Sequence, residues 1–452
     1  MLKRIATALW GKFESSDEIK KFGLLALIFG LIIAVYWGMR PIKDSIFGAI
    51  VGFDYQPLAK MLSLCVATPL VILYGKLIDR FPRQNVFYGL TAFYGVAALA
   101  FAAGFMHPTI GLSNVVEDPS RWIGWAWYVY VESFGSLIVA LFWAFTTDIT
   151  DTQSAQRGFP LIALFGQMGN IFGPYLLQAK RYGLGNSAPI VAVIGVLIFV
   201  IGLLLWVFTK IIPAAQMSGY HAADGEEKHS EPGLFEGLRL LLTQGYLFGI
   251  FLVIFFYEVI LTIFDFHFKS AVKAIYPAEA DNAAYLSDYA VWVGIVATAC
   301  VFFGINNIQR HLGMRASLIL LPLLIATAVG TLWLYPTAIN VAFWIMVLSK
   351  AINYALNQPT LKQLYIPTTK DAKYKAQAWI EMFGSRGSKA AGSTINSFKK
   401  PLELSMGKVA GGSTFIAVTT LSSGVMILVW LFAAVYVAKR YTHAVNNKQV
   451  VC

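Results

Sequence analysis

The feature that most constrains the fold is a run of about twenty apolar residues that recurs along the chain. A run of this length forms a helix long enough to cross the hydrocarbon core of a bilayer. The 452 residues are 57% hydrophobic and only 13% charged, whereas soluble domains average about 25% charged residues. We therefore predict an all-α membrane protein with about twelve transmembrane helices. The expected spans are residues 22–40, 57–79, 85–106, 122–147, 159–180, 188–211, 244–268, 286–305, 315–334, 337–358, 376–398 and 413–438.

The longest polar interruption between these spans predicts a division into two six-helix halves. Its charge, glycine and proline content is typical of a solvated linker. Lysine and arginine gather in the loops on the same side as both chain ends, so we expect both termini to be cytoplasmic. The predicted parts are a cytoplasmic N-terminal segment (1–21), an N-terminal half (22–211), a cytoplasmic linker (212–240), a C-terminal half (241–438) and a cytoplasmic tail (439–452).

A short internal repeat supports this division. Phe165-Gly-Gln-Met-Gly-Asn170 in the fifth span resembles Phe383-Gly-Ser-Arg-Gly-Ser388 in the eleventh, and Arg157 and Lys375 stand equally far ahead of the two motifs. Helix packing alone can favour closely spaced small residues, but the matching basic residues favour a duplicated six-helix unit. Two parallel repeats are the plan of the major-facilitator fold, whose site lies at the midplane between the halves. We expect this fold.

Charged residues at the end of the first span give the first candidate site. Arg40 and Lys43 share one helix face, Asp44 follows, and Pro41 removes a backbone donor and kinks the helix there. A charge at the bilayer centre costs roughly 2.5–3.5 kcal/mol on insertion scales. Two cations beside a helix break therefore favour an anionic ligand. The alternative is that both side chains extend to the membrane interface.

Two further charges occupy corresponding places in the two halves. Glu132 lies between apolar runs of the fourth span, and Lys350 lies in the tenth, followed by Asn353 on the same polar face. An ionisable group at such depth is a functional candidate. The alternative for Glu132 is a buried pair with a basic residue.

The seventh and eleventh spans complete the set of candidate residues. Asp265 and Lys269 stand one helical turn apart, so a local ion pair is the simpler interpretation of the two. Glu258 lies deeper, where a carboxyl group can titrate near neutral pH and carry a proton. Arg386 and Lys389 lie among glycine and serine in a weakly apolar span, a composition typical of a helix that lines an aqueous cavity.

These residues favour a secondary transporter of an anionic, phosphorylated solute. Arginine binds phosphate with two parallel hydrogen bonds, and lysine offers a point charge. No phosphate-binding loop, dinucleotide fingerprint or His/Cys cluster occurs in the sequence, so we predict no enzyme activity, no cofactor and no metal site. The net charge of +11 reflects basic cytoplasmic loops and does not indicate nucleic-acid binding. A non-transporting membrane receptor on the same scaffold stays an alternative.

Four stretches resemble the ATP/ADP translocase (nucleotide transporter) family of plastids and intracellular bacteria. They are Tyr36-Trp-Gly-Met-Arg-Pro-Ile-Lys-Asp44; Val131-Glu-Ser-Phe-Gly-Ser136 with Phe142-Trp143; Phe264-Asp-Phe-His-Phe-Lys-Ser270 with Tyr276-Pro277; and the stretch from Tyr354 through Pro359-Thr360 and Tyr365-Ile-Pro367 to Lys389-Ala-Ala-Gly392. The resemblance extends along nearly the whole chain. It places the family's functional residues on Lys43, Glu132, Asp265 and Lys389. The chain departs from the family pattern at Asn353, Gln358 and Arg386, where lysine, aspartate and proline are frequent, and these departures concern the choice of substrate.

The resemblance implies ATP/ADP exchange by alternating access, with the nucleotide as the only ligand beside the lipid bilayer. Within transport, the alternative is proton-coupled symport of a nucleotide or another organic phosphate, with Glu258 as the proton carrier. We expect the protein to be a monomer. We also expect it to lie in a bacterial inner membrane, because residues 1–21 contain acidic residues that a transit peptide avoids.

Overall fold

The computed structural model describes residues 13, 15–213, 217, 234–305, 307–335, 338–369, 376–380 and 384–451, and every regular element in these ranges is a helix. The chain forms two compact units. The first unit contains Met1–Gly225 together with Ile275–Gly294, and the second contains Glu226–Ala274 together with Ile295–Cys452. Most of the linker predicted at 212–240 lies outside the described residues.

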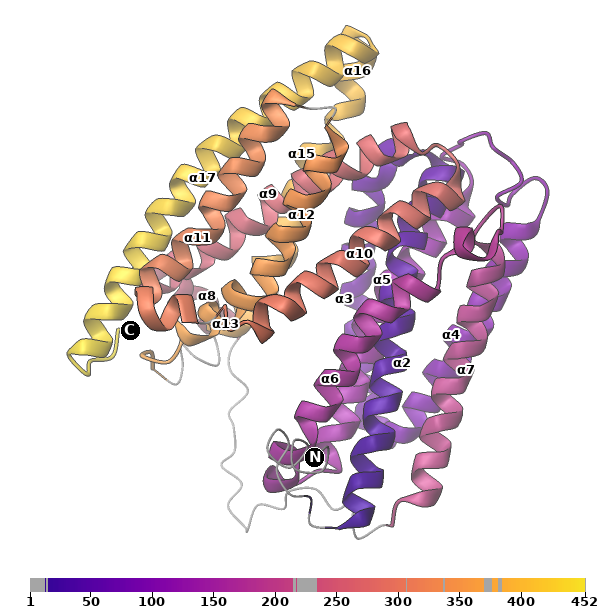
Figure 1. The fold of residues 1–452 in the computed structure, drawn as a ribbon, viewed down its shortest axis with the longest axis horizontal. Helices are drawn as coiled ribbons and strands as arrows, with labels where there is room; N and C mark the ends of the chain where they lie inside the picture. The colour runs from indigo at the N-terminus through magenta and orange to yellow at the C-terminus, as the bar shows by residue number, and fades with distance from the viewer. Residues whose placement is uncertain are drawn as a thin grey trace. The chain divides into compact units, whose positions relative to one another are not determined.

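Long helices make up both units (Figure 1). The elements before the linker are α2 (Ser16–Phe47), η1 (Gly48–Gly52), η2 (Phe53–Tyr55), α3 (Gln56–Arg80), α4 (Arg83–Met106), α5 (Trp122–Asp148), α6 (Thr152–Leu176), η3 (Ala179–Tyr182) and α7 (Ala188–Ile211). Those after it are α8 (Leu234–Thr243), α9 (Gly245–Ile275), α10 (Glu279–Phe302), α11 (Asn307–Leu334), α12 (Ile339–Ile352), η5 (Asn353–Asn357), α13 (Gln358–Gln363), α14 (Gln377–Trp379), α15 (Ser385–Ser397), α16 (Lys399–Met406) and α17 (Lys408–Asn446).

These helices confirm the predicted all-α membrane fold. In the described ranges, nine helical stretches are long and apolar enough to cross a membrane. One of them, Ser16–Ile78, contains the first two predicted spans. The two predicted spans outside this set are α6, which contains Pro160 and Pro174, and residues 376–398, of which the structure describes α14 and α15.

The first helix begins six residues before the predicted boundary at residue 22. The Ser15 hydroxyl caps it by accepting a hydrogen bond from the Glu18 backbone N–H at 3.0 Å. Glu18 is buried, because its carboxylate accepts hydrogen bonds from Arg157 at 2.8 and 3.0 Å and from Ser154 at 2.6 Å. Arg157, the basic residue ahead of the glycine motif, therefore joins the start of α6 to the start of α2. Its counterpart Lys375 lies outside the described residues.

Glycines in or near the repeated motif allow close helix packing in each unit, although a Cβ on Gly387 of the second copy would have no neighbour within 4 Å. A Cβ on Gly169 of α6 would lie 2.2 Å from the carbonyl oxygen of Gly30 in α2, and one on Gly173 would lie 2.2 Å from that of Ala34. In the second unit, a Cβ on Gly392 of α15 would lie 2.9 Å from the carbonyl oxygen of Val259 in α9. The first and fifth spans of each half are thus packed on small residues.

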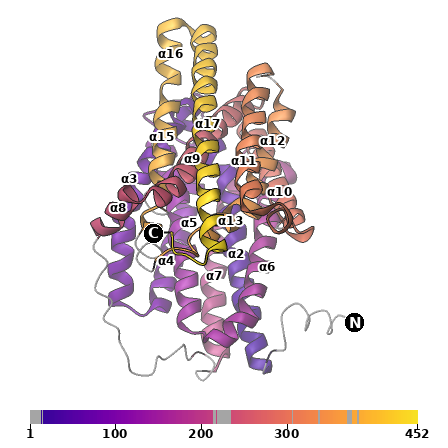
Figure 2. The ribbon, with the colours of Figure 1, turned by 90° about the vertical axis from the view of Figure 1, so that its left-hand side faces the viewer.

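Two further arrangements shape the units. The first part of α10 belongs to the first unit, because the Glu279 carboxylate accepts hydrogen bonds from the Ser45 hydroxyl of α2 at 2.8 Å and from the Ser187 hydroxyl and N–H before α7 at 2.7 and 2.8 Å. In the second unit, α16 folds back on α17 at Gly407, which has a φ of 84° (Figure 2).

Candidate functional site

In the first unit, Lys43 of α2 and Glu132 of α5 form an ion pair. The Lys43 side chain is only 5% exposed, and its ammonium group also lies 3.7 Å from the Asp44 carboxylate and 4.1 Å from the centre of the Tyr128 ring. Glu132 is 38% exposed, so one side of the pair remains accessible. Lys43 therefore does not extend to the membrane interface, and Glu132 has the basic partner that its depth requires.

Two more cations surround this pair. The Arg40 guanidinium lies 4.7 Å from the centre of the Trp37 ring and 5.8 Å from that of Tyr36, which are cation–π distances. Lys60 of α3 lies within electrostatic range of the Glu132 carboxylate. The sequence analysis missed Lys60, because a lysine near the start of the second span looks like an interfacial residue; its place three residues after Pro57, at the N-terminal turn of that span, gave no signal of depth.

In the second unit, one carboxylate holds two lysines. Asp265 of α9 contacts Lys269 at 2.6 Å through one oxygen and Lys350 of α12 at 2.9 Å through the other. All three side chains are at most 15% exposed. The local pair expected between Asp265 and Lys269 is present, and the tertiary contact with Lys350 adds a second cation. The cluster carries a net charge of +1.

The remaining sequence candidates lie in α9, η5 and α15. The Lys389 ammonium is 3.8 Å from the Glu258 carboxylate. Glu258 also lines a cavity of about 190 Å³ together with Gln358 and Ser385. Asn353 is buried and its side-chain oxygen accepts a hydrogen bond from Asn357 at 2.9 Å. Arg386 is half-buried and has no ion-pair partner in the part of the chain that the structure describes.

The two units share a plan with reversed polarity. In the first, a cation on the first helix (Lys43) pairs with a carboxylate on the fourth (Glu132). In the second, a carboxylate on the first helix (Asp265) pairs with a cation on the fourth (Lys350). Each unit thus holds a lysine amine, at most 15% exposed, against a carboxylate from another helix of the same unit.

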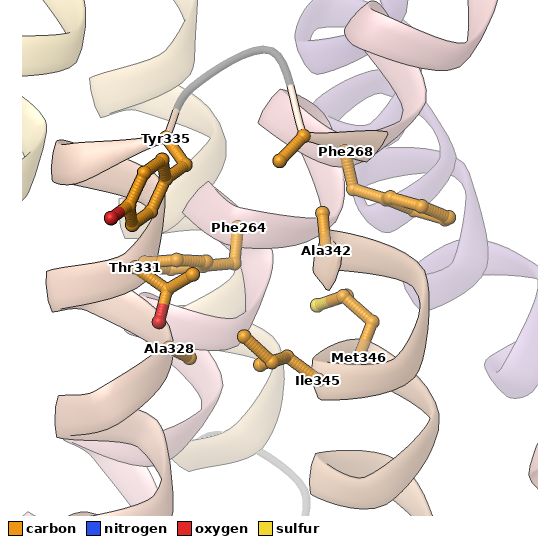
Figure 3. A pocket seen from close by; sticks show the side chains of 9 residues that line it. Phe264, Phe268, Ala328, Thr331, Tyr335, Ala342, Ile345 and Met346 are labelled. Atoms are coloured by element: carbon orange, nitrogen blue, oxygen red, sulfur yellow. The ribbon is translucent and has the colours of Figure 1, made fainter. Parts of the chain in front are cut away.

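Two other cavities differ in size and lining. One of about 520 Å³ is lined by Lys180, Arg181, Asp281 and Asp288, among others. Aromatic and aliphatic side chains of α9, α11 and α12 enclose the cavity in Figure 3, including Phe264, Thr331 and Met346. Its volume is about 20 Å³, room for roughly one water molecule. Within the described ranges, no three His, Cys, Asp or Glu side chains stand close enough together to hold a metal ion.

Comparison with known proteins identifies the family. The sequence model of the TLC ATP/ADP transporter family matches residues 2–441. The chain belongs to this family. It is therefore a multi-pass membrane transporter and not an enzyme, as the sequence predicted.

Relatives match this family member over almost their whole length. It is 25% identical to ADP,ATP carrier protein 1 of Rickettsia bellii, over 96% of the chain and 95% of that protein. It is 26% identical to ADP,ATP carrier protein 1 of Rickettsia prowazekii, with the same coverage. Among solved structures, a mutant of the nucleoside transporter NupG has a TM-score of 0.65 at 13% identity, covering 91% of this chain and 99% of that one. A bacterial homologue of the iron transporter ferroportin has a TM-score of 0.64 at 11% identity, covering 93% and 100%. These structures support the major-facilitator-like fold.

Proposed function

We propose that the protein exchanges ATP for ADP by alternating access, as a monomer in a bacterial inner membrane with both termini in the cytoplasm. Membership of the TLC ATP/ADP transporter family and the names of the ADP,ATP carrier relatives support the substrate. The observation that carries the mechanism is the pair of buried lysine–carboxylate contacts, Lys43–Glu132 and Lys350–Asp265.

In this mechanism, the nucleotide phosphates take the place of the carboxylates. In the first unit, Lys43 and Arg40 bind phosphate. In the second unit, the phosphate-binding residues are Lys269, Lys350, Arg386 and Lys389, and Asn353 donates a hydrogen bond. Glu132 and Asp265 release their lysines when phosphate arrives and take them back when it leaves. Because phosphate binds arginine and lysine through charge-assisted hydrogen bonds, the exchange of partners conserves the number of strong contacts.

The same pairs couple inward and outward transport. A carrier that changes its open side must let the pairs change partners, and a bound nucleotide supplies the replacement. Without it, a buried lysine loses its carboxylate partner with nothing to replace it, at a cost of about 3–5 kcal/mol. A barrier raised by that amount slows the return of the empty carrier roughly 10²- to 10⁴-fold, so net loss of nucleotide is slow while exchange is fast.

Uptake of radiolabelled ATP into proteoliposomes tests the proposal. Wild-type protein should import ATP when the vesicles contain ADP and should do so poorly when they are empty, with or without a proton gradient. Lys43→Ala should abolish uptake, whereas the matched variant Lys180→Ala, at a lysine whose side chain is 61% exposed, should leave it intact. Unchanged uptake by Lys43→Ala would refute the assignment of this site.

One observation favours proton-coupled symport as the second candidate. Glu258 is 15% exposed, lines the cavity of about 190 Å³ and lies near Lys389, so water in that cavity can reach its carboxylate. Under this mechanism, Glu258→Gln abolishes the uptake driven by a proton gradient into empty vesicles. If ATP uptake by the wild type into vesicles without internal nucleotide does not respond to the proton gradient, proton-coupled symport is excluded.

A further inference from the structure

The Tyr36 ring lies directly on the α carbon of Gly135. A Cβ built on Gly135 would be 2.0 Å from Cε2 of the ring and 2.4 Å from Cζ, and real Cβ atoms do not approach other atoms so closely. Moving from 2.0 Å to an ordinary contact of 3.4 Å requires a displacement of at least about 1.4 Å. Only glycine therefore allows the ring to occupy this place.

This contact belongs to the same helix face as the ion pair. On α2, Tyr36, Arg40 and Lys43 follow one another at spacings of four and three residues, which places them on one face. On α5, Glu132 stands one turn before Gly135. Lys43 contacts Glu132 and Tyr36 contacts Gly135, so Arg40 lies between these two contacts along α2.

Arg40 lies against two aromatic rings, one of which is that of Tyr36. Its guanidinium lies over the Trp37 and Tyr36 rings, at 4.7 and 5.8 Å from their centres. A planar guanidinium binds phosphate with two parallel hydrogen bonds, so the orientation of its plane matters for binding. A shift of the Tyr36 ring away from Gly135 would therefore also shift the Arg40 guanidinium that lies against this ring.

We propose that Gly135 and Tyr36 are positioning residues that orient Arg40 toward the phosphates of a nucleoside diphosphate or triphosphate. This rests on the proposed nucleotide transport. A Cβ at residue 135 displaces the Tyr36 ring and with it the guanidinium, without removing any charge from the site. Misplacement of a binding group by about 1 Å is enough to cost up to roughly a hundredfold in a positioned reaction.

The alternative is that Gly135 only lets α2 and α5 pack closely. Gly124 provides the matched control, because it lies on the same helix and its Cβ would be 2.5 Å from Cγ2 of Val51, far from Arg40 along α5. Gly124→Ala thus reproduces the packing strain of Gly135→Ala without moving the Tyr36 ring. Arg40→Gln removes the cation whose position is in question.

The experiment measures initial rates of ADP uptake into ADP-loaded proteoliposomes for wild type, Gly135→Ala, Arg40→Gln, their double variant and Gly124→Ala. We expect Gly135→Ala to raise the KM for ADP about tenfold or more. In the Arg40→Gln background, Gly135→Ala should have no further effect on KM. Gly124→Ala should leave KM unchanged. If Gly135→Ala does not fold, Tyr36→Leu removes the ring and should give the same dependence on Arg40.

The outcomes separate the two proposals. No ADP uptake by the wild type refutes the proposed function. Wild-type uptake together with an unchanged KM in Gly135→Ala or Tyr36→Leu overturns the positioning role alone. An equal rise in KM with and without Arg40, or an equal rise in Gly124→Ala, also overturns it, because both results indicate a packing effect.

Discussion

Replacing Asp265 with asparagine removes the only carboxylate that the structure shows between Lys269 and Lys350 in the described part of α9 and α12. At an effective dielectric constant of about 20, opposite charges this close attract each other by roughly 6 kcal/mol, and loss of hydration offsets part of that gain. Removing one partner of a buried pair costs about 3–5 kcal/mol. Because two lysines at most 15% exposed lose their partner together, we expect Asp265→Asn to lower the free energy of unfolding by about 5 kcal/mol.

Thermal unfolding of the purified protein in detergent measures this loss, and anions test its origin. Without the Asp265 carboxylate, the two lysines attract phosphate more strongly, so ADP should raise the unfolding temperature of Asp265→Asn by more than it raises that of the wild type. The same variant should bind ADP more tightly and exchange it more slowly, because Asp265 no longer competes for the lysines when the nucleotide leaves.

Asp281→Asn is the matched control. Its partner Lys180 lies at 2.8 Å, but both side chains are largely exposed, and exposed ion pairs contribute little to stability. We expect its unfolding temperature to equal that of the wild type. The reasoning is wrong if Asp265→Asn unfolds at the wild-type temperature without nucleotide, or if ADP stabilises both proteins equally.

Three further predictions concern the scaffold. Glu279→Ala leaves the Ser187 N–H and hydroxyl without their buried acceptor and should cost about 1–3 kcal/mol in thermal unfolding. The Asp151 carboxylate caps α6, and the backbone N–H groups at Ser154 and Gln153 lower its pKa below the usual 3.8. The stabilisation that this carboxylate gives should therefore be complete at neutral pH and be lost as the pH falls below about 4. Unfolding of the wild type and of Asp151→Asn measured as a function of pH tests this. Gly169→Val should overpack α6 against α2 and lower stability by about 1–3 kcal/mol in the same assay.

Each of these predictions has a result that contradicts it. Glu279→Ala with wild-type stability would mean that other groups hold the start of α10. Asparagine is also a good N-cap residue, so Asp151→Asn should differ from the wild type at neutral pH and approach it as the pH falls below 3.8. Parallel curves at all pH values would contradict the argument. Gly89 has open space around its α carbon, so Gly89→Val must remain stable if the effect at Gly169 comes from packing.

The sequence predicted the helices and the charged candidate residues better than it predicted which residues these charges contact. Apolar runs and the charge cost of the bilayer depend on local composition, so the spans and the charges at depth could be predicted from the chain alone. The contact between Asp265 and Lys269 was predictable because it lies within one helix. The contact of Asp265 with Lys350 was not, because it depends on how α9 packs against α12.

Tertiary packing also decides the two features that the sequence analysis missed. Lys60 is close to Glu132 only because α3 and α5 are neighbours in the first unit. The first part of α10 belongs to the first unit because Glu279 finds its donors there, although it follows the linker in the sequence. The glycine motif, by contrast, had a local signal, and Gly166 and Gly169 of its first copy do lie against α2, whereas Gly387 of its second copy has open space around it.

The attachment of α10 has a practical consequence for dividing this protein into fragments. A fragment that ends in the linker contains Ser45 and Ser187 but lacks Glu279, which accepts their hydrogen bonds. Such a fragment exposes polar groups and an apolar surface that the intact chain covers with residues 275–294. Split expression at the linker should thus yield a soluble, ordered first fragment in detergent only when the second fragment is co-expressed. A cut in the loop at Gly304, after α10, keeps the first unit whole.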